Sequence, residues 1–154
     1  MSPSAKHLYD FLDPLIKSSN RVPLYVMPPG AVTSFSVDKS GKDPVICVKL
    51  DRRYMRVIND VKEGLGQVTF EVEFTREIRG KLRDGMLVDL TGVLCRRLPL
   101  SIKAKVIKMI LPKPGDTTLT FSGKVPFLPT ISLPLQCSHF QSCEMWRDTV
   151  PLED

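Results

Sequence analysis

The sequence lacks the patterns that mark membrane-spanning and secreted proteins. No stretch of about 18 uninterrupted apolar residues occurs, which argues against a transmembrane helix. The first residues do not combine a basic region with a long apolar run, so no signal peptide is visible. The chain has only four cysteines, unevenly spaced, and we expect reduced thiols in a cytoplasmic or nuclear protein that is not secreted.

Familiar catalytic signatures are also missing. The motifs GxGxxG, GxSxG and HExxH do not occur, and Ser40-Gly41-Lys42 lacks the first glycine and the final Ser/Thr of a phosphate-binding loop. Glu71 and Glu73 would share one face of a strand. With Arg76 and Arg79 nearby, that spacing favours ion pairs over acid–base catalysis. We therefore predict that the protein is not an enzyme and uses no cofactor.

Metal-binding residue types gather in the order Cys-x-His-x₃-Cys, at Cys137, His139 and Cys143. A structural zinc site usually takes four ligands in two close pairs. No recognisable acid would orient the histidine of a Cys–His nucleophile pair. We predict neither a metal site nor a catalytic cysteine. The candidates for a fourth zinc ligand, none of which the sequence places nearby, are His7, Cys47 and Cys95.

Aromatic residues make up 7% of the chain, and its thirteen prolines gather toward the two ends. The middle, Gln67 to Ile110, is therefore free to form continuous strands. Apolar and polar residues alternate there in 68–75, 86–91 and 102–106, with turn residues at Arg83-Asp84-Gly85. The pattern predicts an antiparallel meander, with a basic loop at Arg96–Pro99 before its last strand.

Further strands are expected on both sides of this meander. The apolar register changes phase at Val106-Ile107, which predicts a β-bulge that would help a sheet to coil. The other predicted strands are Val22–Met27, Val32–Asp38, Pro44–Leu50 and Leu119–Val125.

An amphipathic helix is predicted from about Pro3 to Lys17, and Pro14 would shorten it near Asp13. We expect its apolar stripe to cover the core or one end of the sheet; the alternative is a partner helix that packs outside the domain. The stripe consists of Leu8, Phe11, Leu12, Leu15 and Ile16.

Residues 51–63 fit two interpretations, a helical stripe or a strand through Tyr54–Ile58. Arg52, Arg53 and Arg56 lie beside Tyr54 in both cases. An aromatic ring among arginines suits base stacking, although a packed tyrosine with solvated neighbours is the more common arrangement.

The chain divides into a β-rich domain with its helix, residues 1–125, and a proline-rich arm, residues 126–154. The prolines argue against a ladder strand in the arm, yet its apolar side chains need burial. We predict an extended arm that docks on its own domain or on a partner or second copy, with the partner favoured. The contact residues would be Phe127, Leu128, Ile131, Leu133, Leu135 and Trp146.

The net charge of +5 is spread unevenly. Residues 91–125 carry seven Lys/Arg against one acid, Asp116, whereas residues 126–154 carry one Arg against four acids. A basic block of this kind favours phosphates or an anionic surface, and a solvated face is the simpler alternative.

The stretch Lys81–Leu94 resembles the fourth strand of OB-fold domains, with Gly85, Val88 and Gly92 on that family's characteristic places. The following Leu100–Ile110 is similar to the family's closing strand. The resemblance implies a small antiparallel β-barrel or OB-like sheet that binds single-stranded nucleic acid through its central strands and loops. The residues nominated for this contact are Arg52, Arg53, Tyr54, Arg56, Arg96, Arg97, Lys103 and Lys105.

Two functional hypotheses follow. The first is a non-enzymatic nucleic-acid-binding or assembly subunit of a larger complex, which uses a basic β-face and loops. The alternative is a structural, self-associating protein, for example a small viral matrix-like protein that contacts membrane or nucleoprotein.

Overall fold

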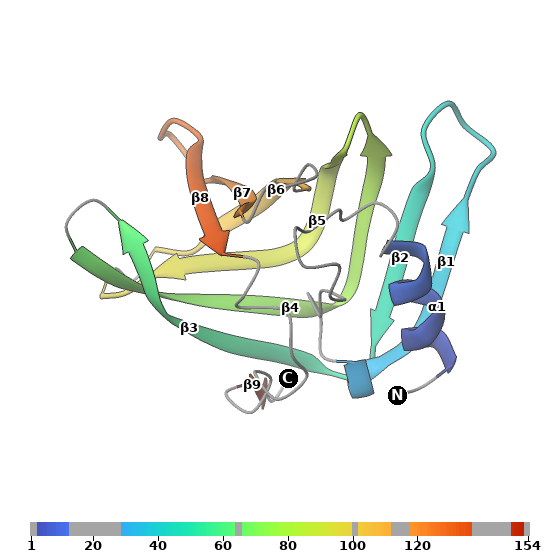
Figure 1. Ribbon diagram of the computed structural model, residues 1–154, viewed down its shortest axis with the longest axis horizontal. Coiled ribbons are helices and arrows are strands. Elements are labelled where there is room, and N and C mark those ends of the chain that lie inside the picture. Colours follow the sequence, from blue (N-terminus) through green and yellow to red (C-terminus); the bar gives the residue numbers. More distant parts are fainter. Residues whose placement is uncertain are drawn as a thin grey trace.

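The computed structural model describes residues 3–12, 29–63, 66–99, 102–111, 118–136 and 149–152, which form one bent antiparallel sheet and a short α-helix (Figure 1). The prediction of a mainly β protein is confirmed. The helical segments are α1 (Pro3–Leu12) and the 3₁₀ turn η1 (Pro29–Ala31). The strands are β1 (Val32–Asp38), β2 (Val45–Leu50), β3 (Arg53–Glu63), β4 (Gly66–Arg83), β5 (Met86–Arg97), β6 (Ala104–Ile110), β7 (Thr118–Lys124), β8 (Ile131–Gln136) and β9 (Thr149–Leu152).

β4 joins the two parts of the sheet, because its halves pair with different neighbours on one side. Its first half pairs with β3 and its second half with β2, while β5 runs along the other side of both. β1 lies beyond β2, β9 lies beyond β3, and β6, β7 and β8 follow β5. Within the described part of the chain the sheet is open, so the OB-like barrel is not confirmed.

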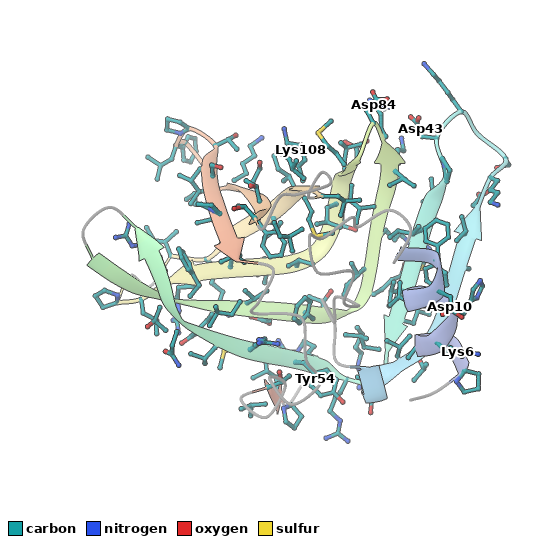
Figure 2. The ribbon with its side chains drawn as sticks, in the orientation of Figure 1. Lys6, Asp10, Asp43, Tyr54, Asp84 and Lys108 are labelled. Carbon is teal, nitrogen blue, oxygen red and sulfur yellow. The ribbon has the colours of Figure 1, made fainter. Side chains whose placement is uncertain are left out.

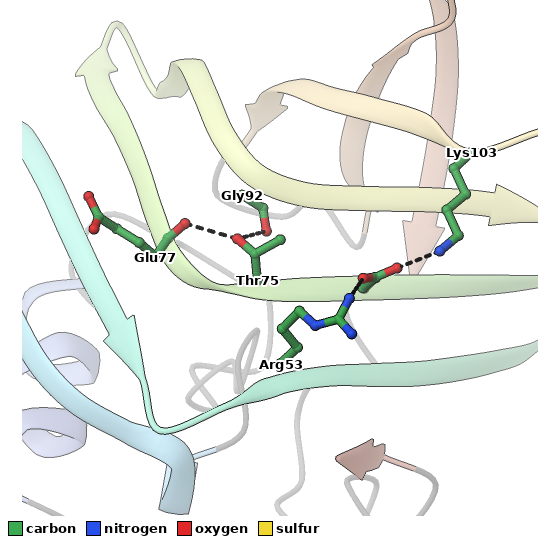
Figure 3. Close-up of polar contacts among 6 residues, drawn as sticks. Arg53, Thr75, Glu77, Gly92 and Lys103 are labelled. Atoms are coloured by element: carbon green, nitrogen blue, oxygen red, sulfur yellow. Dashed lines mark hydrogen bonds and ion pairs between the residues drawn. The ribbon is translucent and has the colours of Figure 1, made fainter. Parts of the chain in front are cut away.

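β4 and β5 bend together where their pairing shifts register, between Phe74 and Arg79 (Figure 1). Gly92 of β5 lies against this bend with a φ of +94°, and a Cβ there would come within 2.2 Å of the carbonyl oxygen of Glu77. The Thr75 hydroxyl lies 3.0 Å from the carbonyl oxygens of both Glu77 and Gly92 and can donate to either (Figure 3). The two backbones approach this closely because residue 92 has no side chain.

Two predictions about local chain geometry are confirmed. Asp84 and Gly85 form the turn between β4 and β5 with φ values of 50° and 73°, as in a type I′ hairpin turn. β6 pairs with β7 with a register shift between Val106 and Lys108, which is the expected bulge. Val106 and Met109 are both buried, so the bulge brings these two residues to the same face although they are three positions apart.

One apolar core lies against what we call the inner face of the sheet. Phe70, Val72 and Phe74 of β4 belong to this core, and the intervening Glu71 and Glu73 lie on the opposite, outer face. This alternation decides which side chains the sheet presents to solvent.

α1 covers one end of this core, as predicted. Ala5 and Leu8 are fully buried, and Phe11 packs against Phe35 of β1 with ring centroids 5.6 Å apart. The core thus includes apolar residues from the helix as well as from the sheet. The rest of the predicted helix, Asp13–Lys17, and the predicted strand Val22–Met27 lie outside the described residues.

Residues 51–63, which fitted either a helix or a strand, form β3 from Arg53 onward. Tyr54, Arg56 and Ile58 lie opposite inner-face residues of β4. The segment forms a strand because pairing with β4 places Ile58 in the core beside Phe70. A local helix would not provide this long-range contact.

The prediction that the arm contains no ladder strand was wrong. Ile131–Gln136 forms β8, which pairs with β7. Pro134 is tolerated there because β8 ends the row of paired strands. Leu133 and Leu135 are buried in the core, so this part of the arm docks on its own chain. β9, which pairs with β3, also lies beyond residue 125.

We expect Gly92→Ala to lower the free energy of unfolding by about 3 kcal/mol or more, because it adds a backbone clash to an unfavourable φ. The matched control is Gly41→Ala in the β1–β2 turn. A Cβ there meets nothing within 4 Å, so we expect a change below about 0.5 kcal/mol. Chemical denaturation measures both, and equal stabilities would contradict this account of the bend.

Candidate functional site

Charged side chains from three adjacent strands, and from the residue that precedes a fourth, meet on the outer face of the sheet. Glu71 and Glu73 come from the first half of β4, between β3 and β5. The cations come from β3, from β5 and from the residue before β6. We call these residues the charged cluster: Arg53, Glu71, Glu73, Arg96 and Lys103.

Glu73 occupies the centre of the charged cluster, with a side chain only 7% exposed. Arg53 Nη1 donates to its Oε1 at 3.2 Å, and Lys103 Nζ donates to its Oε2 at 2.8 Å (Figure 3). Arg96 donates to the neighbouring Glu71. A carboxylate this buried needs charged partners, so Arg53 and Lys103 help to hold the sheet together.

The pairing partners of the two glutamates differ from those predicted. Glu71 and Glu73 share one face, as expected, but Arg79 pairs with Glu77 instead. Arg96 lies within β5, which continues to Arg97, so the predicted basic loop was wrong in its first two residues. A strand position explains why Arg96 reaches across to β4.

Three lysines lie on the outer face beside the charged cluster, and we call them the lysine strip: Lys105, Lys108 and Lys124. Lys105 of β6 lies opposite Lys124 of β7, and Lys108 lies opposite Ser122. The bulge in β6 brings Lys105 and Lys108 to the same face although they are three residues apart. Among the described residues these lysines form no ion pair, so their mutual repulsion favours an added anion.

Tyr54 does not join the lysine strip. Its ring packs against the core and its hydroxyl donates to Asp51 at 2.7 Å. Burial, followed by this hydrogen bond, raises the pKa of Tyr54 to about 12. Figure 2 places Tyr54 and Lys108 on opposite sides of the molecule. The ring is therefore not placed to stack on a base bound at the strip.

The remaining predicted nucleic-acid residues are dispersed. Arg56 is buried on the inner face, opposite Val72. Arg52 is exposed beside Asp51, just before β3. Arg97 is exposed at the end of β5. Of the eight residues nominated from the sequence, Lys105 alone belongs to the lysine strip, and three others belong to the charged cluster.

Lys108 and Lys124 were counted in the basic block but not nominated as site residues. Nothing in the local sequence distinguishes them from other surface lysines. Their relation to Lys105 depends on the register of β6 against β7 and on the bulge between them. The predicted bulge at Val106-Ile107 was the one usable signal, because it implied that Lys105 and Lys108 would share a face.

An apolar cavity of about 410 Å³ opens where the end of β5 and the start of β6 meet the β7–β8 connection. Its walls include the buried residues Phe70, Cys95 and Leu133 and the exposed residues Ile102, Leu128 and Ile131. The predicted partner-binding residues are thus divided. Leu133 and Leu135 are buried, Phe127, Leu128 and Ile131 are exposed, and Trp146 lies outside the described residues.

The described cysteines do not form a reactive centre. Cys47 and Cys95 are both buried and free, and burial raises the pKa of the Cys95 thiol to about 12. His7 is exposed and contacts the ring of Phe35 edge-on. The described part of the chain contains no group of three or more potential metal ligands, and Cys137, His139 and Cys143 lie outside it.

Comparisons with known proteins identify no relative. No protein-family model, curated protein or solved structure matched the chain. Within the described residues, no helix has the length and apolar character needed to cross a membrane.

We expect the double variant Arg53→Ala/Lys103→Ala to lower the free energy of unfolding by about 3 kcal/mol, because it leaves a buried carboxylate without two of its cations. Adding Glu73→Gln should recover more than half of this loss, because the buried charge is then gone. Denaturant unfolding of the double and triple variants measures the effect. A triple variant less stable than the double would contradict the assigned role of Glu73.

We expect Cys95 to resist alkylation by iodoacetamide at pH 8 in the folded protein. Its raised pKa keeps the thiol protonated there, and only the thiolate is a good nucleophile. Peptide mapping by mass spectrometry should find Cys95 modified after denaturation and unmodified before it. Rapid modification in the native protein would show that the thiol is accessible.

Proposed function

We propose that the protein is a non-enzymatic subunit that binds the phosphate backbone of a single-stranded nucleic acid through the lysine strip. The observation that carries this proposal is the set of three outer-face lysines without ion pairs among the described residues. The neighbouring acids Glu71 and Glu73 are already paired with cations of the charged cluster, so they do not neutralise the strip.

The spacing of the strip suits a flexible polyanion. Lys105 and Lys124 lie on neighbouring strands, about 5 Å apart at their Cα atoms. Lys108 lies about 7 Å further along, because the bulge sets three residue steps of β6 against two of β7. A single strand adjusts its phosphates to such a pattern more readily than a stiff duplex does. Binding would depend on charge and have little base preference, because Tyr54 packs against the core.

We further propose that β4, β5 and β6 form an OB-like binding surface and that the protein acts in the cytoplasm or nucleus. A role within a larger complex fits this proposal, because three phosphate contacts give only modest affinity on their own. Self-association remains the competing function, and light scattering on the full chain separates the two.

We expect the lysine strip variant Lys105→Gln/Lys108→Gln/Lys124→Gln to weaken oligonucleotide binding at about 50 mM salt by roughly tenfold or more. For the unmodified protein, the logarithm of the binding constant should fall with that of the salt concentration with a slope of about −2, as three contacts to a single strand imply. Fluorescence anisotropy with a labelled single-stranded oligonucleotide measures both quantities.

The matched control is Lys6→Gln/Lys39→Gln/Lys42→Gln, which removes the same charge from exposed positions on α1 and the β1–β2 turn. Its binding should change much less than that of the strip variant. Equal losses in both variants would assign the binding to net charge, and undetectable binding by the unmodified protein would overturn the proposal.

A further inference from the structure

Four large apolar side chains are exposed together around the connection between β7 and β8. Phe127 is completely exposed, and the exposed fractions are 57% for Leu128, 44% for Ile131 and 57% for Ile102. Three of them, Ile102, Leu128 and Ile131, line the same apolar cavity. We call these four residues the apolar loop cluster. Exposed apolar groups gathered at one place commonly mark an interaction surface.

The backbone holds Phe127 in an unusual conformation. Pro126 and Phe127 are the central residues of a tight turn closed by the Leu128 N–H, which donates to the Val125 carbonyl at 3.2 Å. Phe127 has a φ of 66°, at the second central position, where a type II turn strongly prefers glycine. Because the side chain is fully exposed, packing within the chain does not compensate this strain.

The apolar loop cluster lies in a basic part of the molecule. The described residues of 93–111 and 118–136 contain lysines and arginines but no Asp or Glu. Lys124 ends β7 just before the turn, and Arg97 lines the cavity together with Ile102 and Leu128. The β7–β8 connection projects toward the same side of the molecule as the labelled Lys108 (Figures 1 and 2).

We propose that this loop docks on an anionic lipid bilayer, with Phe127 and Leu128 entering the boundary between headgroups and acyl chains. The charges of Lys124 and Arg97 complement lipid phosphates and carboxylates, and apolar insertion adds to that attraction. A protein partner with an apolar groove would not by itself account for the absence of acids on the described strands around the loop. The inference goes beyond the proposed nucleic-acid contact, because it concerns the apolar loop cluster and a different ligand; the two contacts share Lys124.

The test is flotation of the full chain with phosphatidylcholine vesicles, with and without about one-third phosphatidylserine. We expect binding to the anionic vesicles and little binding to the neutral ones. Phe127→Gly should weaken vesicle binding about tenfold, because it removes the largest inserting side chain. Its melting temperature should stay the same or rise, because glycine suits the turn.

The matched control is Val150→Ser, which removes an exposed apolar side chain from β9. This variant should bind vesicles as the unmodified protein does. Oligonucleotide binding by Phe127→Gly should also be unchanged, because Phe127 lies outside the lysine strip. The variant therefore distinguishes a failure of the bilayer contact from a failure of the nucleic-acid contact.

Three results would overturn the bilayer proposal. The first is equal vesicle binding by the unmodified protein and a folded Phe127→Gly variant. The second is equal binding to neutral and anionic vesicles. The third is a vesicle-free oligomer that dissociates in Phe127→Gly, which would assign the loop to a second copy of the chain.

Discussion

The close approach of Gly92 to the bend in β4 is the contact on which the rest of the architecture depends. The carbonyl of Glu77 occupies the space that a side chain at residue 92 would need. Beyond the bend β4 pairs with β2, and before it β4 pairs with β3. Because β5 follows the same bend, one continuous strand pair links the helix-covered end of the core to the end that carries β6, β7 and β8.

The outer face of the sheet separates structural charge from available charge. Glu71 forms an ion pair with Arg96, and Glu73 forms ion pairs with Arg53 and Lys103. These three cations, which the sequence alone would assign to nucleic-acid binding, therefore have a structural role. The lysine strip lies one and two strands further along, where the described strands supply no acid. The proposed nucleic-acid contact on β6 and β7 and the proposed bilayer contact at the β7–β8 connection are therefore neighbours that share Lys124.

Features set by local chemistry were predictable from the sequence. The alternation of apolar and polar residues predicted the strands of the meander, and Asp84-Gly85 predicted the turn between β4 and β5. The change of apolar register at Val106-Ile107 predicted the bulge in β6. Features set by distant pairing were not. Arg56 faces the core because β3 pairs with β4, and the proline-containing β8 forms because β7 offers an unpaired edge. The turn strain at Phe127 also escaped prediction, since nothing in its side chain signals a positive φ.

The central claim, that the bent β4–β5 pair makes one cooperative unit of the two sheet halves, is tested most directly by native-state hydrogen exchange along β4. Amides at 70–74 pair toward β3 and β5, and those at 77–81 pair toward β2 and β5. With increasing denaturant, the account predicts that both groups exchange through the same opening and converge on one free energy. Two separate openings, with one group losing protection while the other keeps it, would contradict the claim.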